Sequence, residues 1–344
     1  MSAFQDRDAP GGDWEGPRRT GKQLFMVAAL FLGFVVTAFA AEEKPAGNVT
    51  AGKRIRLSGN LNFRVSAEDP GRNGFSVSKA RLSVSGELFK NATFKFQVEA
   101  ITTPHVLDAQ MDIAFHKMAA VSLGQFKVPF SQENIYTDTD LDTIKRSQPV
   151  VAMCPGYDTD SSGRDIGMVF YGTHSILEYT VGIFNGEGIN KPPTNKPKDL
   201  AGRLRLNPAA FLAIGVSYYK GTAGATADAP VGRRDRAGVE MTLGTGAFSL
   251  KGEYIKAWDE DLDRHGWYLQ VSHFLVAKRF QGVLKVDSYN PNIDIPGSRS
   301  NLWTVGINWF IAPRTKLQVN YGCYLNEAGR TTKRSLIVQL RGGF

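Results

Sequence analysis

Basic side chains recur at every second position in parts of this 344-residue sequence. The clearest pairs are Arg54 with Arg56 and Arg203 with Arg205. On an extended strand, residues i and i+2 lie on the same face, so both guanidinium groups of a pair point the same way. Two such groups can share one oxyanion through charge-assisted hydrogen bonds. The chemistry that these pairs indicate is recognition of small anions.

Residue types for catalysis or metal binding form no comparable pattern. The five histidines are scattered without metal-ligand spacing. No Ser, His and acid set falls at facing positions on neighbouring segments, and no Gly-rich phosphate loop is present. We therefore expect no enzyme, no metal and no other cofactor.

Short alternating segments must position the arginines. From Lys53 onward, stretches of about ten residues carry apolar groups at every second position and end in breaks rich in Gly, Pro, Asn or Asp. This period-two pattern predicts β-strands. The sixteen segments cover residues 53–66, 74–88, 92–101, 106–116, 119–127, 165–172, 176–186, 199–206, 210–220, 232–244, 246–258, 264–275, 278–288, 299–311, 314–326 and 332–344.

The connections between these segments alternate in length. Those after even-numbered segments are short, as at 117–118 and 312–313, and most of the others are longer, as at 187–198 and 289–298. Short and long connections therefore lie at opposite ends of the strands. We predict an all-β fold, namely a 16-stranded antiparallel transmembrane β-barrel with short periplasmic turns and longer external loops.

An apolar stretch near the N-terminus predicts export. Leu24–Ala40 follows a basic flank and closes on Ala38-Phe39-Ala40, as a signal peptide does. We expect a leader at 1–40 with the signal peptide at 18–40, a short periplasmic segment at 41–52 and the barrel at 53–344. A mis-assigned start codon is our preferred explanation for the residues before the signal. A single membrane anchor is the alternative, although the stretch is short for a span of ~20 residues.

The alternative to a membrane barrel is a soluble all-β sandwich or propeller. The export signal argues against it, and so does the last segment, which alternates to a terminal Phe344 and resembles the strand by which outer-membrane barrels are recognised for assembly. Amphipathic rings also fall near strand ends, where a headgroup boundary favours them. These are Tyr218, Tyr254, Trp258, Trp267, Tyr289, Trp303, Trp309 and Tyr321. We therefore predict that the protein is located in the bacterial outer membrane.

The net charge of +8 is unchanged when the leader is removed, because residues 1–40 hold four basic and four acidic side chains. Alternation assigns thirteen cations and eight acids to the inner face of the barrel. A positive lumen raises the local concentration of anions, although any one cation could instead brace the wall or meet lipopolysaccharide. The candidate anion-binding residues on strands are Arg54, Arg56, Arg64, Arg81, Arg203, Arg205, Arg234 and Arg236.

One connection is far longer than the rest. Residues 128–164 are too apolar for a loop in water, so we expect them to fold against the inner wall and constrict the lumen. The constriction would bring in Lys127, Lys145 and Arg146, whereas the orientation of the acidic run at 138–142 stays open.

The segments "LGQFKVPFSQEN", "TIKRSQPV" and "GRDIGMVFYG" at 123–134, 143–150 and 163–172 resemble the phosphate-selective porin O and P family. The resemblance implies a sixteen-stranded outer-membrane channel, commonly trimeric, with an inward third loop and a basic lumen for phosphate-like anions. Lys127 and Arg146 belong to the matching motif.

Our leading hypothesis is a porin for passive diffusion of small anions, phosphate or similar oxyanions among them. The expected partners are these anions, outer-membrane lipid and lipopolysaccharide, and two further copies in a homotrimer, with no nucleic acid. The alternatives are a barrel that serves as a scaffold or sheath for another exported protein, and a general non-selective porin.

Overall fold

A computed structural model describes residues 50–51, 55–71, 73–101, 105–193, 197–223 and 232–344. The predicted leader, nearly all of the 41–52 segment and Arg54 lie outside the described residues, so those predictions stay predictions. Within these ranges, no helix is long and apolar enough to cross a membrane.

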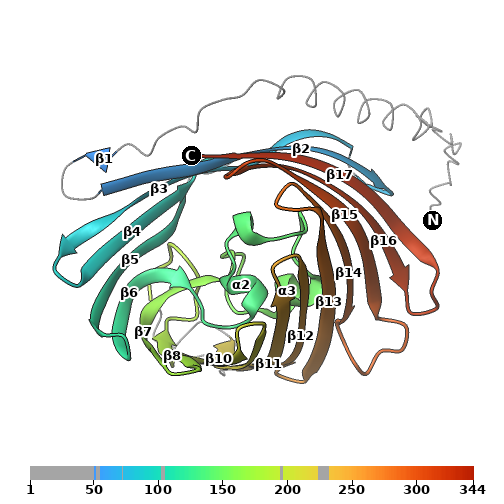
Figure 1. The fold of residues 1–344 in the computed structure, drawn as a ribbon. Coiled ribbons are helices and arrows are strands. Elements are labelled where there is room, and N and C mark those ends of the chain that lie inside the picture. The colour runs from blue at the N-terminus through green and yellow to red at the C-terminus, as the bar shows by residue number, and fades with distance from the viewer. Residues whose placement is uncertain (1–49, 52–54, 72, 102–104, 194–196, 224–231) are drawn as a thin grey trace, which may run out of the picture. The chain divides into compact units, whose positions relative to one another are not determined.

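Sixteen antiparallel strands, β2 to β17, form the wall of a barrel (Figure 1). They are β2 Ile55–Asp69, β3 Gly74–Phe89, β4 Ala92–Glu99, β5 His105–His116, β6 Ala119–Lys127, β7 Arg164–His174, β8 Leu177–Phe184, β9 Asp199–Ala209, β10 Leu212–Ala223, β11 Gly232–Thr245, β12 Phe248–Asp259, β13 Leu262–Val276, β14 Phe280–Asn290, β15 Ser300–Ala312, β16 Thr315–Asn326 and β17 Thr331–Gly343. A two-residue strand, β1 at Thr50–Ala51, pairs with the start of β2. Each predicted segment overlaps one wall strand, so the predicted fold class is confirmed.

The sheet closes on itself between its first and last wall strands. β17 pairs with β2 from Arg334 opposite Asp69 to Gly343 opposite Asn60. Beyond this ladder, the backbones of Gly59 and Phe344 exchange two hydrogen bonds of 3.1 Å. Closure gives the backbone N–H and C=O groups of the edge strands their hydrogen-bond partners, which lipid cannot supply.

The two ends of the barrel differ as predicted. The turns after β3, β5, β7, β9, β11, β13 and β15 are short, and most connections at the other end are longer. Two details differ from expectation. Thr245 ends β11 instead of forming the turn by itself, and β12 and β13 are joined by residues 260–261 alone.

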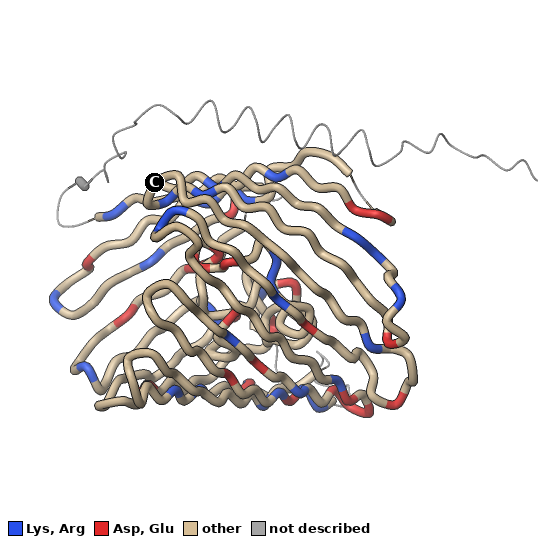
Figure 2. The backbone as a smooth tube through the Cα atoms, turned by 45° about the vertical axis from the view of Figure 1, so that its right-hand side comes forward, with Lys and Arg blue, Asp and Glu red and all other residues tan. Residues whose placement is uncertain are grey.

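The outer face is apolar and the inner face is polar. Val216, Trp267 and Val305 are exposed on the outside, whereas Gln318 and Gln339 are fully buried inside. Charged residues follow the strands and gather at several strand ends (Figure 2). This inversion of the pattern of a water-soluble domain suits a wall with lipid outside and water inside.

The predicted inward loop between β6 and β7 lies within the barrel (Figure 1). It contains α2 at Gln132–Ile135, the 3₁₀ turn η1 at Asp138–Asp140 and α3 at Gln148–Met153. Residues 128–163 of this segment are called the inner loop below. α3 packs against β12, β13 and β14. The inner loop therefore lies against one side of the lumen and leaves the other side open.

Candidate functional site

An apolar core fixes the inner loop to the wall. Phe130, Val150 and Met153 of the loop are completely buried and belong to one cluster with Ile255 and Tyr268 of the wall. Burial of a large apolar side chain stabilises by roughly 1.5–3 kcal/mol. This explains why the loop is apolar although it crosses an aqueous lumen.

Ion pairs also fix the inner loop to the barrel wall, on the side where the apolar core lies. The Glu133 carboxylate accepts from Lys285 Nζ at 2.6 Å, and both side chains are almost completely buried. The Asp158 carboxylate accepts from Arg234 Nη2 at 2.8 Å and from Arg236 Nη2 at 3.0 Å. Burial alone would raise the pKa of Glu133, but Lys285 and hydrogen bonds outweigh it and lower that pKa. The loop is therefore anchored by buried charges as well as by packing.

The loop carboxylate of Asp142 extends this anchoring. It accepts hydrogen bonds from Lys251 at 3.2 Å, Gln270 at 2.8 Å and Ser272 at 2.9 Å. Part of the acidic run that the sequence left unassigned therefore faces the wall.

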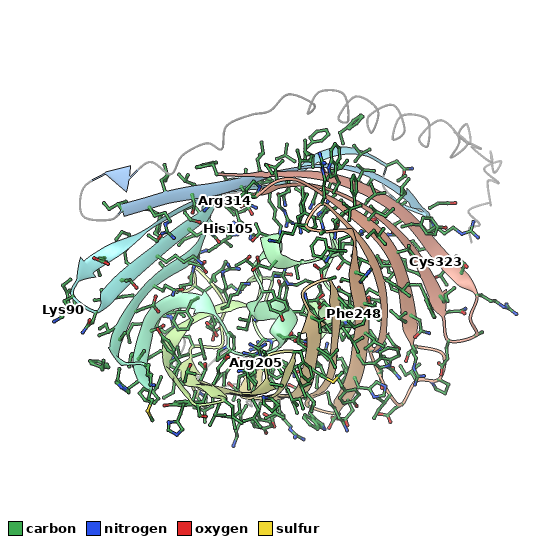
Figure 3. All side chains as sticks on the ribbon, viewed as in Figure 1. Lys90, His105, Arg205, Phe248, Arg314 and Cys323 are labelled. Atoms are coloured by element: carbon green, nitrogen blue, oxygen red, sulfur yellow. The ribbon has the colours of Figure 1, made fainter. Side chains whose placement is uncertain are left out.

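A cavity of about 1720 Å³ occupies the open side of the lumen. Residues of strands β2 to β7 and β14 to β17 line it together with residues of the inner loop. His105 and Arg314, both labelled in Figure 3, belong to its lining. The cavity is large enough for hydrated ions and is the candidate channel.

Positive charge dominates the lining of this channel. Twelve of its side chains are basic, and five are acidic. The basic ones are Arg56, Arg64, Lys79, Arg81, Lys95, Lys127, Lys145, Arg146, Arg164, Arg314, Lys316 and Arg341, and the acidic ones are Glu99, Asp108, Asp138, Asp140 and Asp142. The difference is seven positive charges, which a low-dielectric wall focuses into the lumen.

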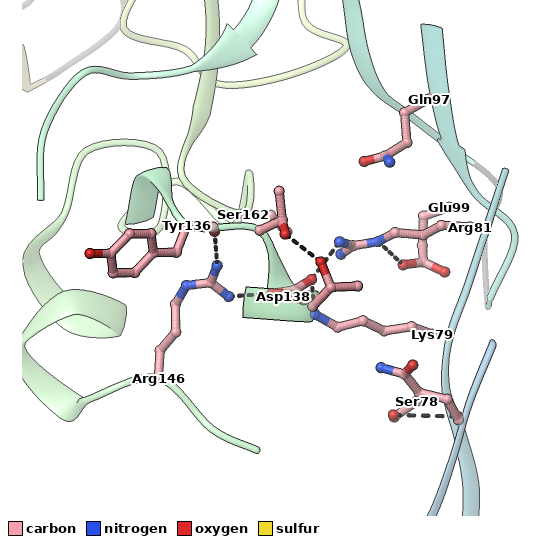
Figure 4. Close-up of polar contacts among 12 residues, drawn as sticks. Ser78, Lys79, Arg81, Gln97, Glu99, Tyr136, Asp138, Arg146 and Ser162 are labelled. Atoms are coloured by element: carbon pink, nitrogen blue, oxygen red, sulfur yellow. Dashed lines mark hydrogen bonds and ion pairs between the residues drawn. The ribbon is translucent and has the colours of Figure 1, made fainter. Parts of the chain in front are cut away.

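A cluster of charged side chains surrounds Asp138 in η1 (Figure 4). Its carboxylate forms ion pairs with Lys79 and Arg81 of β3 and with Arg146 of the inner loop. Arg81 also pairs with Glu99 at 2.8 Å. Burial of Asp138 would raise its pKa, but the three cations reverse the effect and hold that pKa well below its usual range. Asp138 is therefore ionised in the channel.

The three basic residues predicted at the loop all line the channel, but they also have structural partners. Lys127 Nζ donates to three consecutive backbone carbonyls, those of residues 134–136. Arg146 donates to the carbonyls of Glu133 and Tyr136 at 3.0 and 2.9 Å, besides its pair with Asp138. Lys145 pairs with Glu68 at 2.8 Å.

Three of the predicted strand arginines line the channel as well. Arg64 donates to Gln339 Oε1 at 2.8 Å, a neutral partner. Arg56 is exposed, and the structure records no ion pair or hydrogen bond between its side chain and another described residue. Arg81 takes part in the cluster around Asp138. Anion binding by these residues stays a prediction.

The other four predicted strand arginines lie outside the lining of this cavity, and anion binding by them stays a prediction. Arg203 and Arg205 pair with wall carboxylates, the latter with Glu178 at 3.7 Å, and Arg234 and Arg236 hold the inner loop. None of the four lines the cavity. The reason is that the loop packs against one wall, so alternation finds the inner face but not the open part of it.

Several channel residues escaped the sequence reasoning. Lys316 and Arg341 are two of the thirteen cations that alternation places on the inner face, but they are not among the predicted site residues, and Lys79 and Arg164 are in neither set. Lys79 lies two residues before Arg81, so the same alternation would have found it. Opposite the step from Asn62 to Phe63, β3 carries one extra residue, which interrupts the inward-outward alternation just before Lys79.

A closed barrel of sixteen strands with an apolar outer face, an aqueous lumen and an inner loop defines the outer-membrane porins as a class. A family model described as "Phosphate-selective porin O and P" matches residues 49–230 and 221–336, so the chain belongs to that family. It is a porin of the bacterial outer membrane. No curated protein sequence matches the chain.

Solved structures show the same fold. An anion-selective porin from Comamonas acidovorans is 17% identical, with a TM-score of 0.69 over 85% of this chain and 99% of that one. The trimer form of OmpT from Vibrio cholerae is 10% identical, with a TM-score of 0.63 over 85% and 99%. Salmonella typhi OmpF in complex with daunomycin is 10% identical, with a TM-score of 0.64 over 85% and 98%. At these identities the likeness concerns the fold.

Proposed function

We propose that this porin lets small anions, phosphate among them, diffuse passively across the outer membrane. The observation that carries the proposal is the excess of basic over acidic side chains in the lining of the open cavity, twelve against five. Movement down a gradient needs no chemical step. The family and fold are those of channel proteins, which agrees with transport.

The arrangement of the cations supports attraction without permanent capture. Arg56 and Arg64 form no ion pair with an acidic side chain among the described residues, so their donors can replace part of the hydration shell of an anion. Lys95, by contrast, pairs with Asp108 at 2.7 Å. Several partly free donors along one path allow an anion to enter, step and leave.

Phosphate is the finer part of the proposal. It carries more negative charge than chloride near neutral pH, so a positive lumen attracts it more strongly. Guanidinium groups also match its oxygens in geometry. The family description names phosphate selectivity, which supports this choice for the chain.

The membrane setting of the proposal is a homotrimer in lipid and lipopolysaccharide. The outer face exposes many apolar side chains, together with rings such as Tyr218, Trp267 and Trp303. Such rings favour the headgroup boundary. One solved structure of similar fold is a trimer form, which supports the oligomeric state.

Single-channel conductance in planar bilayers tests the function. With chloride as the anion, exchange of K⁺ for the slower Li⁺ is expected to change conductance little, whereas exchange of Cl⁻ for a larger anion lowers it. Phosphate added to chloride is expected to reduce the chloride current. The opposite dependence, with conductance following the cation, would refute anion preference, and a chloride current insensitive to phosphate would refute phosphate binding alone.

A further inference from the structure

One stretch of the channel lining is apolar. Val151 of α3 lines the channel and is 48% exposed. Among the described residues of the inner loop, Ile135 is the other large apolar side chain that is exposed. Phe130 and Val150, in contrast, are completely buried and form the core that holds the loop. Packing of the loop therefore does not explain why Val151 faces water.

The wall next to α3 adds apolar and aromatic side chains. Tyr289 of β14, Leu302 of β15 and Tyr324 of β16 all line the channel. Leu302 pairs with Tyr324 on one side and with Asp287 on the other, and Tyr289 is the next inward-facing residue after Asp287. Opposite and diagonal neighbours on one face of a sheet have Cβ atoms about 4.5–8 Å apart, so the three side chains form one surface. Asp287 itself is buried and accepts from Gln148 Nε2 at 2.9 Å.

The apolar surfaces of the loop and of the wall meet. Ala152, next to Val151 in α3, packs together with Tyr289 against the apolar core. Ile144 of the inner loop lines a small second pocket together with Leu302 and Tyr324. The resulting surface is called the apolar patch below, and it consists of Ile144, Val151, Ala152, Tyr289, Leu302 and Tyr324.

Cations lie at the edge of the apolar patch. Lys145 lines the channel and also the small pocket at Tyr324. Lys333 Nζ lies 5.8 Å from the centre of the Tyr324 ring. Both ammonium groups pair with Glu68, at 2.8 Å from Lys145 and at 2.6 Å from Lys333. Two cations share one carboxylate, so one positive charge remains beside the patch.

We propose that the apolar patch and Lys145 form a binding site for amphipathic organic anions, namely carboxylates that carry an apolar chain or ring. The proposal rests on the anion-porin function above and adds a class of substrate to it. The carboxylate meets the cations, and the apolar body leaves water by lying on the patch. Inorganic phosphate gains nothing there, because it has no apolar part. Tyr289 and Tyr324 lie within two residues of the external ends of their strands, so the site is near the external entrance.

The test measures block of the single-channel chloride current by acetate, butyrate and hexanoate at neutral pH, with the full-length wild type. Full burial of one CH₂ group corresponds to about a fourfold change in a binding constant. The patch covers one side of a chain, so we expect about twofold for each CH₂ group and a half-blocking concentration about tenfold lower, or more, for hexanoate than for acetate. Equal half-blocking concentrations across the series would overturn the proposal.

Two loop variants locate the effect. Val151→Ser removes an exposed part of the apolar patch, so the ratio of the acetate to the hexanoate half-blocking concentration should fall by about threefold or more. Ile135→Ser is the matched control, since Ile135 is also exposed and lines the channel but belongs to α2, where its carbonyl accepts from Lys127. Its ratio should stay within about twofold of the wild type. A ratio unchanged in Val151→Ser, or lowered equally in both variants, would contradict the assigned site. Tyr324→Ser replaces Val151→Ser if the latter does not insert into bilayers.

Further measurements separate the site from other effects. Hexanoate dissolved in the bilayer acts on every variant alike, so it cannot cause a difference between Val151→Ser and Ile135→Ser. Lys145→Gln should raise the half-blocking concentrations of acetate and hexanoate by the same factor, because it removes charge and leaves the apolar contact; loss of the chain-length dependence would contradict these separate roles. In the wild type, cation preference refutes the anion-porin function, whereas anion preference without chain-length dependence refutes only the apolar patch.

Discussion

The buried pair of Glu133 and Lys285 offers a sharp test of how the inner loop constricts the channel. Lys285 Nζ lies 2.6 Å from Glu133 Oε1, and the side chains are 2% and 4% exposed. Lys285→Met keeps an unbranched apolar stem but leaves the carboxylate in the core without its cation. The hydrogen-bond donors that remain for the Glu133 carboxylate are the backbone N–H and the hydroxyl group of Ser147.

The size of the effect follows from the burial. Removal of one partner of a buried ion pair costs about 3–5 kcal/mol, because the other charge stays desolvated and unpaired. Each ~1.4 kcal/mol is a factor of ten in an equilibrium constant. The equilibrium between anchored and released loop therefore shifts by roughly two to three and a half orders of magnitude. The apolar core around Phe130 and the pair at Asp158 remain, so we expect transient release rather than permanent opening.

Planar-bilayer recordings detect such release as brief steps to higher conductance. Lys285→Met is expected to show these steps, and Lys285→Met/Glu133→Gln is expected to reduce them because no buried charge is left unpaired. Lys256→Met is the matched control, since Lys256 pairs with Asp263 at 3.3 Å where both side chains are about one-third exposed. Recordings of Lys285→Met that equal those of the control would refute the anchoring role of the buried pair.

Three further outcomes are expected. Arg203→Gln leaves the buried Glu240 unpaired and should lower barrel stability in urea by about 3 kcal/mol with unchanged ion selectivity. Arg56→Gln should instead reduce anion selectivity with little change in stability, because Arg56 lines the open cavity. The reverse pattern would contradict the distinction between arginines of the open cavity and arginines that pair with the wall. Asp158→Asn weakens two arginine contacts of the loop, so conductance noise should rise, and recordings as quiet as the wild type would argue against this anchor. Because the pKa of Asp138 is lowered in the folded state, its ion pairs stabilise the fold fully above the usual Asp pKa of about 4. This stabilisation is lost as pH falls through the lower folded-state pKa. Stability in urea should therefore show no loss attributable to Asp138 from about pH 8 to about pH 5. Asp138→Asn measured in parallel isolates that contribution, and a loss specific to the wild type above about pH 5 would contradict the assignment.

The barrel could be predicted from the sequence because strands in a membrane wall must alternate. One face meets lipid and the other meets water, so the period of two recurs in every strand, although register shifts such as the one between β2 and β3 interrupt it, and the strand ends differ from expectation by a few residues only. The inner loop was predictable for a related reason. Its apolar residues, such as Val150 and Met153, needed a surface to cover them, and only the inner wall provides one.

The channel itself was only partly predictable. Alternation identifies which strand residues face inward, and Arg234 shows the limit, since it points inward but binds the loop. The loop has no period, so nothing in the sequence indicates that Asp138 faces cations of β3 while Asp142 faces β12 and β13. Such partners depend on how the loop packs in three dimensions.

Anion preference is tested most directly by the zero-current potential of single channels under a KCl gradient. The excess of basic side chains in the open cavity predicts a potential whose sign corresponds to chloride passing more readily than potassium. It also predicts that raised ionic strength on both sides weakens the preference through screening. A potential of the opposite sign would contradict the proposed function.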